Sequence, residues 1–156
     1  MCLILFAYRC HPGLDLLVAA NRDEFHNRPT APLAFWDDAP QVLAGRDLQQ
    51  GGSWMGVTRT GRFAALTNYR DPNRVRQDAP SRGQLVSDYL QGEEPALDYL
   101  ARLATQSEAY NGFNLLLGDE AGLHYYSNCG GAPQTLLPGW YGLSNHLLNT
   151  PWPKLQ

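Results

Sequence analysis

The order of short apolar segments restricts the fold of this chain more than any other feature. Segments of strand length occupy the first and last parts of the chain, and two segments with helical spacing lie between them. Parallel sheets need helices that alternate with strands, whereas grouped strands favour antiparallel pairing. The sequence therefore predicts an α+β fold. At 156 residues, 44% of them hydrophobic, the chain is predicted to form a single domain, 1–156.

The first two predicted strands form a hairpin at the start of the chain. Residues 2–8 and 15–20 are apolar, and the sequence His-Pro-Gly at 11–13 is typical of a turn. The following stretch, 21–52, is rich in Pro, Asp and Gly, and is expected to be a functional loop or a disordered segment. Further strand-like segments lie at 53–58, 62–68, 113–117, 123–126 and 141–145.

Two helices are expected after a polar loop at 69–80. The first, 81–90, carries apolar residues at helical spacing and ends at a glycine. The second, from 93 to about 104, opens with two glutamates, which favour a helix N-terminus. Leu97, Leu100 and Leu103 are predicted to share one face of it.

Composition excludes several classes of protein. The net charge of −3 comes without a basic cluster, which argues against nucleic-acid binding. The apolar N-terminal segment, 2–8, is too short to span a membrane and lacks the features of a secretory signal. Three cysteines without such a signal do not form a disulfide framework, so a cytoplasmic location is expected. The four histidines show no metal-ligand spacing, so no metal site is predicted.

Cys2 is the first candidate for chemistry. Removal of Met1 would leave a thiol and an α-amine on one residue, and the amine could accept the thiol proton. The alternative is a small buried residue on a strand, since free cysteine is often buried. Position alone favours this alternative.

Arg22 and Asp23 follow the second strand within the sequence Asn-Arg-Asp-Glu. In an antiparallel hairpin the end of the second strand lies beside the start of the first, so these residues are expected near Cys2. Arg22 could then lower the thiol pKa and Asp23 could orient the amine. A solvated turn with an internal ion pair is the alternative.

Asn68 and Asn145 each end a short apolar segment. An asparagine amide at such a position can donate a hydrogen bond to a developing oxyanion. An asparagine that simply forms a turn is the alternative reading of each.

Several motifs together resemble the NRDE family, the family of transport and Golgi organisation protein 2. They are collinear over essentially the whole chain: Met-Cys at the start, AANRDEF at 19–25 with Arg-Pro at 28–29, GSWMG at 52–56, AALTNY at 64–69, YNGFN at 110–114, YGLSN at 141–145 and TPWPK at 150–154. Members of that family extend further, so the resemblance implies that this chain is C-terminally truncated.

The resemblance implies an N-terminal-nucleophile (Ntn) hydrolase fold, a four-layer αββα sandwich similar to choloylglycine hydrolase and penicillin V acylase. In that branch an N-terminal cysteine is assisted by an arginine, an aspartate and two asparagines. Matched by motif, these become Cys2, Arg22, Asp23, Asn68 and Asn145. The resemblance implies that a further arginine of that branch would fall in the missing C-terminal part, which leaves this set incomplete.

Two functions remain open at this stage. The first is an amidohydrolase that cleaves a linear, non-peptide C–N bond in a small-molecule amide without a cofactor. The second, implied by the family, is a non-catalytic carrier of haem, acyl-CoA or another lipophilic ligand. Its haem ligand would come from His26, His146 or Cys2. Retention of Met1 would argue against the first function, because the α-amine of Cys2 would then be an amide.

Overall fold

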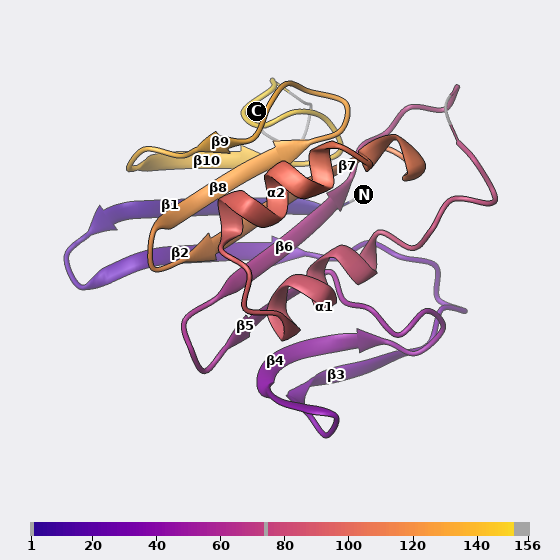
Figure 1. Cartoon of the computed structure of the whole chain (residues 1–156), viewed down its shortest axis with the longest axis horizontal. Helices are drawn as coiled ribbons and strands as arrows, with labels where there is room; N and C mark the ends of the chain where they lie inside the picture. The colour runs from indigo at the N-terminus through magenta and orange to yellow at the C-terminus, as the bar shows by residue number, and fades with distance from the viewer. Residues whose placement is uncertain (1, 74, 152–156) are drawn as a thin grey trace.

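The computed structural model of the chain describes residues 2–73 and 75–151, and these form three layers (Figure 1). A three-stranded antiparallel sheet has the order β10-β1-β2, and a seven-stranded antiparallel sheet has the order β3-β4-β5-β6-β7-β8-β9. Helices α1 and α2 contact the seven-stranded sheet. The predicted α+β class is therefore confirmed. The single domain and the four-layer sandwich stay predictions.

The bounds of the elements in chain order are as follows: β1 Leu3–His11, β2 Leu14–Asn21, β3 Thr30–Trp36, β4 Ala39–Asp47, β5 Met55–Thr58, β6 Phe63–Asn68, α1 Gly83–Gln91, α2 Ala96–Ala104, the short 3-10 helix η1 Ser107–Ala109, β7 Phe113–Asp119, β8 Gly122–Ser127, β9 Gln134–Thr135 and β10 Gly139–Leu143.

The seven-stranded sheet is buried on both faces at its centre. Alternate residues of β6 such as Ala64 and Leu66 pack in the cluster that includes the helices, whereas Phe63 and Ala65 pack toward the three-stranded sheet. Side chains of a strand point alternately to its two faces, so a strand covered on both sides must be apolar throughout. This explains why β6 and β7 are nearly continuous apolar segments in the sequence.

The predicted N-terminal hairpin is confirmed. Strands β1 and β2 pair antiparallel, with Phe6 opposite Val18 and Leu3 opposite Asn21. Gly13 lies in the turn with a φ of +81°, a conformation that glycine adopts without a steric penalty. The hairpin therefore brings the end of β2 beside the start of β1.

The prediction of a loop or disordered segment at 21–52 is wrong over much of that range, because the range contains the hairpin of β3 and β4. Strand β3 lies at the edge of the sheet, and Pro32 is tolerated there because an edge strand leaves some N–H positions unpaired. In β4, Val42 and Ala44 are buried at alternate positions. The strand signal was masked by the high content of turn-forming residues.

The two helices are confirmed with shifted ends. Helix α1 begins at Gly83 and α2 at Ala96, directly after Pro95. Of the three leucines predicted to share one face, Leu100 and Leu103 are buried, whereas Leu97 is 42% exposed. The buried face of α2 consists of Ala96, Tyr99, Leu100 and Leu103.

The C-terminal strands also differ from expectation. Strand β10 ends at Leu143, before the expected end at residue 145, and the two-residue strand β9 had no signal in the sequence. Residues 152–154 of the TPWPK motif lie outside the described residues, as does Met1.

Candidate functional site

A polar cavity of about 280 Å³ lies at the start of β1. Four of the five residues predicted from the sequence line it: Cys2, Arg22, Asp23 and Asn68. The fifth, Asn145, adjoins the cavity, because its Nδ2 donates a hydrogen bond of 2.8 Å to the backbone oxygen of Asn68. The structure thus brings together all five predicted residues, while their chemical roles remain predictions.

The pairing of three strands places Cys2 in this cavity. The last residues paired with β1 are Asn21 on one side and Leu143 on the other, and Arg22 and Ser144 follow them in the chain. Ser144 Oγ donates a hydrogen bond of 2.9 Å to the Cys2 carbonyl oxygen. This contact holds the segment that carries Asn145 against Cys2.

The Arg22 guanidinium is held by an aromatic ring and by an acid. Its central carbon lies 4.2 Å from the centroid of the Trp54 ring, and its Nη2 lies 3.4 Å from Glu24 Oε2. Stacking of this kind restricts the orientation of an arginine side chain, and the guanidinium remains charged. Arg22 is therefore a fixed positive charge on the wall that also carries Cys2.

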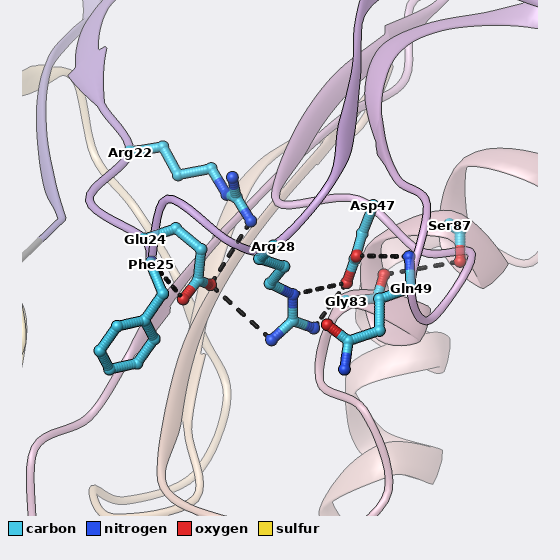
Figure 2. A network of polar contacts seen from close by, with 8 residues as sticks. All are labelled: Arg22, Glu24, Phe25, Arg28, Asp47, Gln49, Gly83 and Ser87. Atoms are coloured by element: carbon cyan, nitrogen blue, oxygen red, sulfur yellow. Dashed lines mark hydrogen bonds and ion pairs between the residues drawn. The ribbon is translucent and has the colours of Figure 1, made fainter.

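The same carboxylate begins a chain of ion pairs that borders the cavity (Figure 2). Glu24 Oε2 lies 3.8 Å from Arg28 Nη1, and Arg28 Nη2 lies 2.6 Å from Asp47 Oδ2. Burial alone would raise the pKa of Asp47, but hydrogen bonds from Arg28 and the backbone of Gln49 outweigh it and lower the pKa. The network links the loop after β2 to the end of β4.

Arg82 is a lining residue that the sequence did not reveal. It lies at the N-cap of α1, is partly buried, and donates a hydrogen bond of 2.8 Å from Nη1 to the Gly112 carbonyl. Burial lowers the pKa of Arg82, and the charges of Glu24 and Cys2 partly oppose that shift. In the sequence this residue was simply the start of a helix, and no local motif marked it.

Asn145 is 6% exposed, and its two amide atoms differ in their partners. Nδ2 donates to Asn68, whereas the buried Oδ1 has no hydrogen-bond partner among the residues that the structure describes. A buried polar atom of this kind is unusual in folded proteins and often marks a functional position. The side chain thus offers one further N–H and an acceptor oxygen next to the Asn68 backbone, which adjoins the cavity.

The fold and this cavity define an α+β protein with a cysteine in a polar site at the edge of its sheets. The sequence model described as "Transport and Golgi organisation 2" matches residues 1–156. The chain belongs to this family.

Individual relatives agree with the family match. The chain is 42% identical over 168 residues to the "Transport and Golgi organization 2 homolog" of Mus musculus. The aligned region covers 99% of this chain and 60% of the mouse protein. It is 43% identical to the Bos taurus homolog, with the same alignment length and the same coverage of both chains. It is 31% identical to "Transport and Golgi organization protein 2" of Drosophila melanogaster, over all of this chain and 62% of that protein. The chain thus spans about 60% of the length of these relatives.

No helix within the described part of the chain has the length and apolar character needed to cross a membrane.

Proposed function

We propose that this protein is an N-terminal-cysteine amidohydrolase of the Ntn type that cleaves a linear, non-peptide C–N bond. The observation that carries the proposal is that Cys2 lines a polar cavity together with Arg22, Asp23 and Asn68. These residues come from three separate strand ends, so their convergence is a property of the fold. A nucleophile, a fixed cation and amide donors are the groups that acyl transfer requires.

The proposed reaction proceeds through a thioester. The Cys2 sulfur forms a bond to the substrate carbonyl carbon, and the α-amine of Cys2 takes the thiol proton and passes it to the leaving nitrogen as the C–N bond breaks. Water then attacks the thioester, which releases the acid and restores the thiol. Asn68 and Asn145 would donate to the oxyanion, Arg22 would stabilise the thiolate, and Asp23 would orient the amine.

The contacts of Asn145 restrict its part in this reaction. One N–H of its Nδ2 is already donated to Asn68, so one N–H remains for the oxyanion. Its Oδ1 would serve as an acceptor for a donor on the substrate or on Cys2. The mechanism also requires removal of Met1, which lies outside the described residues.

The test of this proposal begins with the intact mass of the native protein, which should lack Met1. Turnover of a panel of fluorogenic N-acyl amides should then be abolished by Cys2→Ala and strongly reduced by Cys2→Ser. Cys10→Ala is the matched control, because Cys10 is exposed at the far end of β1. Retention of Met1, or equal turnover by the Cys2 variants, would contradict the proposal.

A second candidate function, a carrier of a lipophilic ligand such as acyl-CoA or haem, is favoured by a separate observation. An apolar cleft of about 670 Å³ lies between the two sheets, and its walls include Leu16, Val18, Met55 and Phe63. This volume is in the range of small-molecule sites, which are mostly apolar. Neither Cys2 nor any histidine is among its lining residues, so the cleft favours an acyl chain over ligated haem.

Binding measurements on a full-length family protein would test the carrier function. Calorimetric titration with a long-chain acyl-CoA should show binding that Val18→Asp abolishes and that Leu14→Asp, on an exposed position of the same strand, leaves intact. A shift of the haem Soret band would instead support haem. The absence of both signals would contradict a carrier role.

A further inference from the structure

The YNGFN motif at 110–114 adjoins the Cys2 cavity, although the proposed reaction gives none of its residues a role. Asn111 of this motif lines the cavity, and its side chain contacts the backbone of Arg76, which lies 35 positions earlier. The Arg76 N–H donates a hydrogen bond of 2.8 Å to Asn111 Oδ1, and Asn111 Nδ2 donates one of 2.8 Å to the Arg76 carbonyl oxygen. One side chain therefore satisfies both backbone polar groups of Arg76, because an asparagine amide carries a donor and an acceptor.

The next residue, Gly112, holds both ends of the chain that connects β6 to α1. Its carbonyl oxygen accepts a hydrogen bond of 2.9 Å from the Tyr69 N–H, directly after β6, and one of 2.8 Å from Arg82 Nη1. A Cβ at position 112 would lie 3.1 Å from the Cβ of Tyr69, so the close approach favours glycine. Asn111 and Gly112 thus contact the connection at its middle and at its two ends.

Segment 75–80 of this connection has few other ties to the protein. It contains no helix or strand. Within the part of the chain that the structure describes, its hydrogen bonds to residues outside the connection all come from Arg76: the two with Asn111 and one of 3.3 Å from Nη1 to the Glu108 carbonyl oxygen. Two of these three bonds depend on Asn111. Irregular segments with few contacts open locally at a low free-energy cost, so the Asn111 side chain determines where this segment lies.

The same segment forms one wall of the Cys2 cavity. Residues 76, 77, 79 and 80 line the cavity together with Cys2. The cavity volume of about 280 Å³ lies near the lower limit for small-molecule sites. A group that overfills such a site is excluded unless a wall moves. The position of segment 75–80 therefore sets the space that is available beside Cys2.

We propose that Asn111 is a positioning residue of the Cys2 cavity, which holds segment 75–80 in place and thereby limits the size of the group that reaches the Cys2 sulfur. The limit applies to any molecule that enters the cavity. Its meaning for a substrate rests on the proposed amidohydrolase function, under which the enzyme prefers amides with small substituents and loses this preference when Asn111 no longer holds the wall.

Alkylation of Cys2 tests the size limit without any need for turnover. Iodoacetamide and its N-phenyl derivative, iodoacetanilide, are both uncharged, and each forms a bond from its methylene carbon to the thiolate sulfur with loss of iodide. They differ in one phenyl ring. The rate of each reagent at Cys2 is measured by peptide mass spectrometry, and cleavage after Arg9 separates Cys2 from Cys10. The rates at exposed Cys10 serve as the internal reference.

The ratio of the iodoacetanilide to the iodoacetamide rate at Cys2, divided by the same ratio at Cys10, should be below one in the unmodified protein. Asn111→Asp is nearly isosteric and replaces the donor that faces the Arg76 carbonyl oxygen by an acceptor. It should raise the ratio about threefold to tenfold, the effect of a lost hydrogen bond of ordinary strength. An unchanged ratio in folded Asn111→Asp would overturn the proposal.

Asn73→Asp is the matched control. It makes the same chemical change in the same connection, but Asn73 does not line the cavity, and its side chain makes no hydrogen bond within the described ranges. The ratio at Cys2 should therefore stay at the value of the unmodified protein. An equal rise in the two variants would show that added charge, and not the contact with Arg76, opens the cavity.

Two measurements on the unmodified protein decide the matter if Asn111→Asp does not fold. The backbone amide of Arg76 should exchange its hydrogen more slowly than those of Val75 and Gln77, which have no hydrogen-bond acceptor among residues 2–73 and 75–151. Equal exchange of the three amides would show that Asn111 does not hold the segment in solution. A normalised alkylation ratio of one would show that there is no size limit. Either result would overturn the proposal.

The outcomes also separate this inference from the proposed function. A size limit that Asn111→Asp relaxes, without turnover of any amide, would contradict the hydrolase and leave the positioning role standing. Turnover with the same preference for small amides in Asn111→Asp and in the unmodified protein would support the hydrolase and contradict the positioning role.

Discussion

Arg28 donates two hydrogen bonds to a single carboxylate oxygen of Asp47, from Nη2 at 2.6 Å and from Nε at 3.1 Å. The two residues are 19 positions apart, and the pair joins the loop after β2 to the end of β4. The Asp47 side chain is 8% exposed and that of Arg28 is 30% exposed, so the pair is partly shielded from solvent. It links the segment that carries Arg22 to the seven-stranded sheet.

The Asp47→Asn variant should lower the free energy of unfolding by about 1–3 kcal/mol at pH 7, because it leaves the Arg28 charge without its acceptor. Asp38→Asn breaks an exposed ion pair with Arg46 and should change stability much less. Urea denaturation of the three proteins measures the difference. Equal losses for the two variants would contradict a structural role for the buried pair.

The contribution of Asp47 should also depend on pH. Its pKa is lowered in the folded state, so its stabilisation is present above the unfolded pKa of about 3.9 and is lost as the pH falls through the folded value. The difference in unfolding free energy between the unmodified protein and Asp47→Asn should therefore shrink below about pH 4. A difference that stays constant to pH 3 would show that Asp47 acts by packing alone.

His124 should make the protein less stable in mild acid. Burial lowers its pKa, although the nearby Asp119 opposes this, and its Nδ1 lies 3.1 Å from Thr135 Oγ1. His124 therefore binds a proton more readily in the unfolded chain than in the folded one below about pH 6.5. The free energy of unfolding should decrease as the pH is lowered through that range. His124→Gln should flatten the slope of unfolding free energy between pH 7 and 5. An unchanged slope in His124→Gln would contradict this assignment.

Gly52 should not tolerate a side chain. A Cβ at this position would lie 2.4 Å from the backbone carbon of Gly83, at the start of the helix that follows Arg82. Gly52→Ala should therefore lower stability by about 1–3 kcal/mol by overpacking. Gly131→Ala, at a position with nothing within 4 Å, should change it by less than about 0.5 kcal/mol. Thermal melts of the two variants compare these effects, and similar melting temperatures would contradict the close approach.

Tyr125 should hold the segment that carries Asn145. Its hydroxyl donates to Asn114 Oδ1 at 2.8 Å and accepts from the Leu148 amide at 3.2 Å, while Asn114 Nδ2 donates to the His146 carbonyl. Tyr125→Phe should cost about 1 kcal/mol and speed amide exchange in residues 144–150.

The matched control for this variant is Tyr126→Phe, which removes one buried hydrogen bond to Ser107. It should cost a similar free energy and leave exchange in 144–150 unchanged. Faster exchange in that segment in both variants would show that Tyr125 has no specific part in holding it.

The sequence by itself determined the central part of the fold. Strands β6 and β7 were predictable because burial on both faces requires continuous apolar residues. The N-terminal hairpin is predictable from its turn, and antiparallel pairing by itself implies that Arg22 lies near Cys2. These features depend on local periodicity and on contacts between neighbours in the chain.

Only the tertiary structure decided the rest. The β3–β4 hairpin and the 19-residue separation of Arg28 and Asp47 depend on pairing across the sheet. Arg82 enters the Cys2 cavity because α1 packs on the seven-stranded sheet, although 80 positions separate the two residues in the chain. Residues so far apart share no sequence pattern, because the chain between them constrains their distance only weakly. The packing of α1 on the sheet therefore places Arg82 in the cavity, although no sequence pattern predicts it.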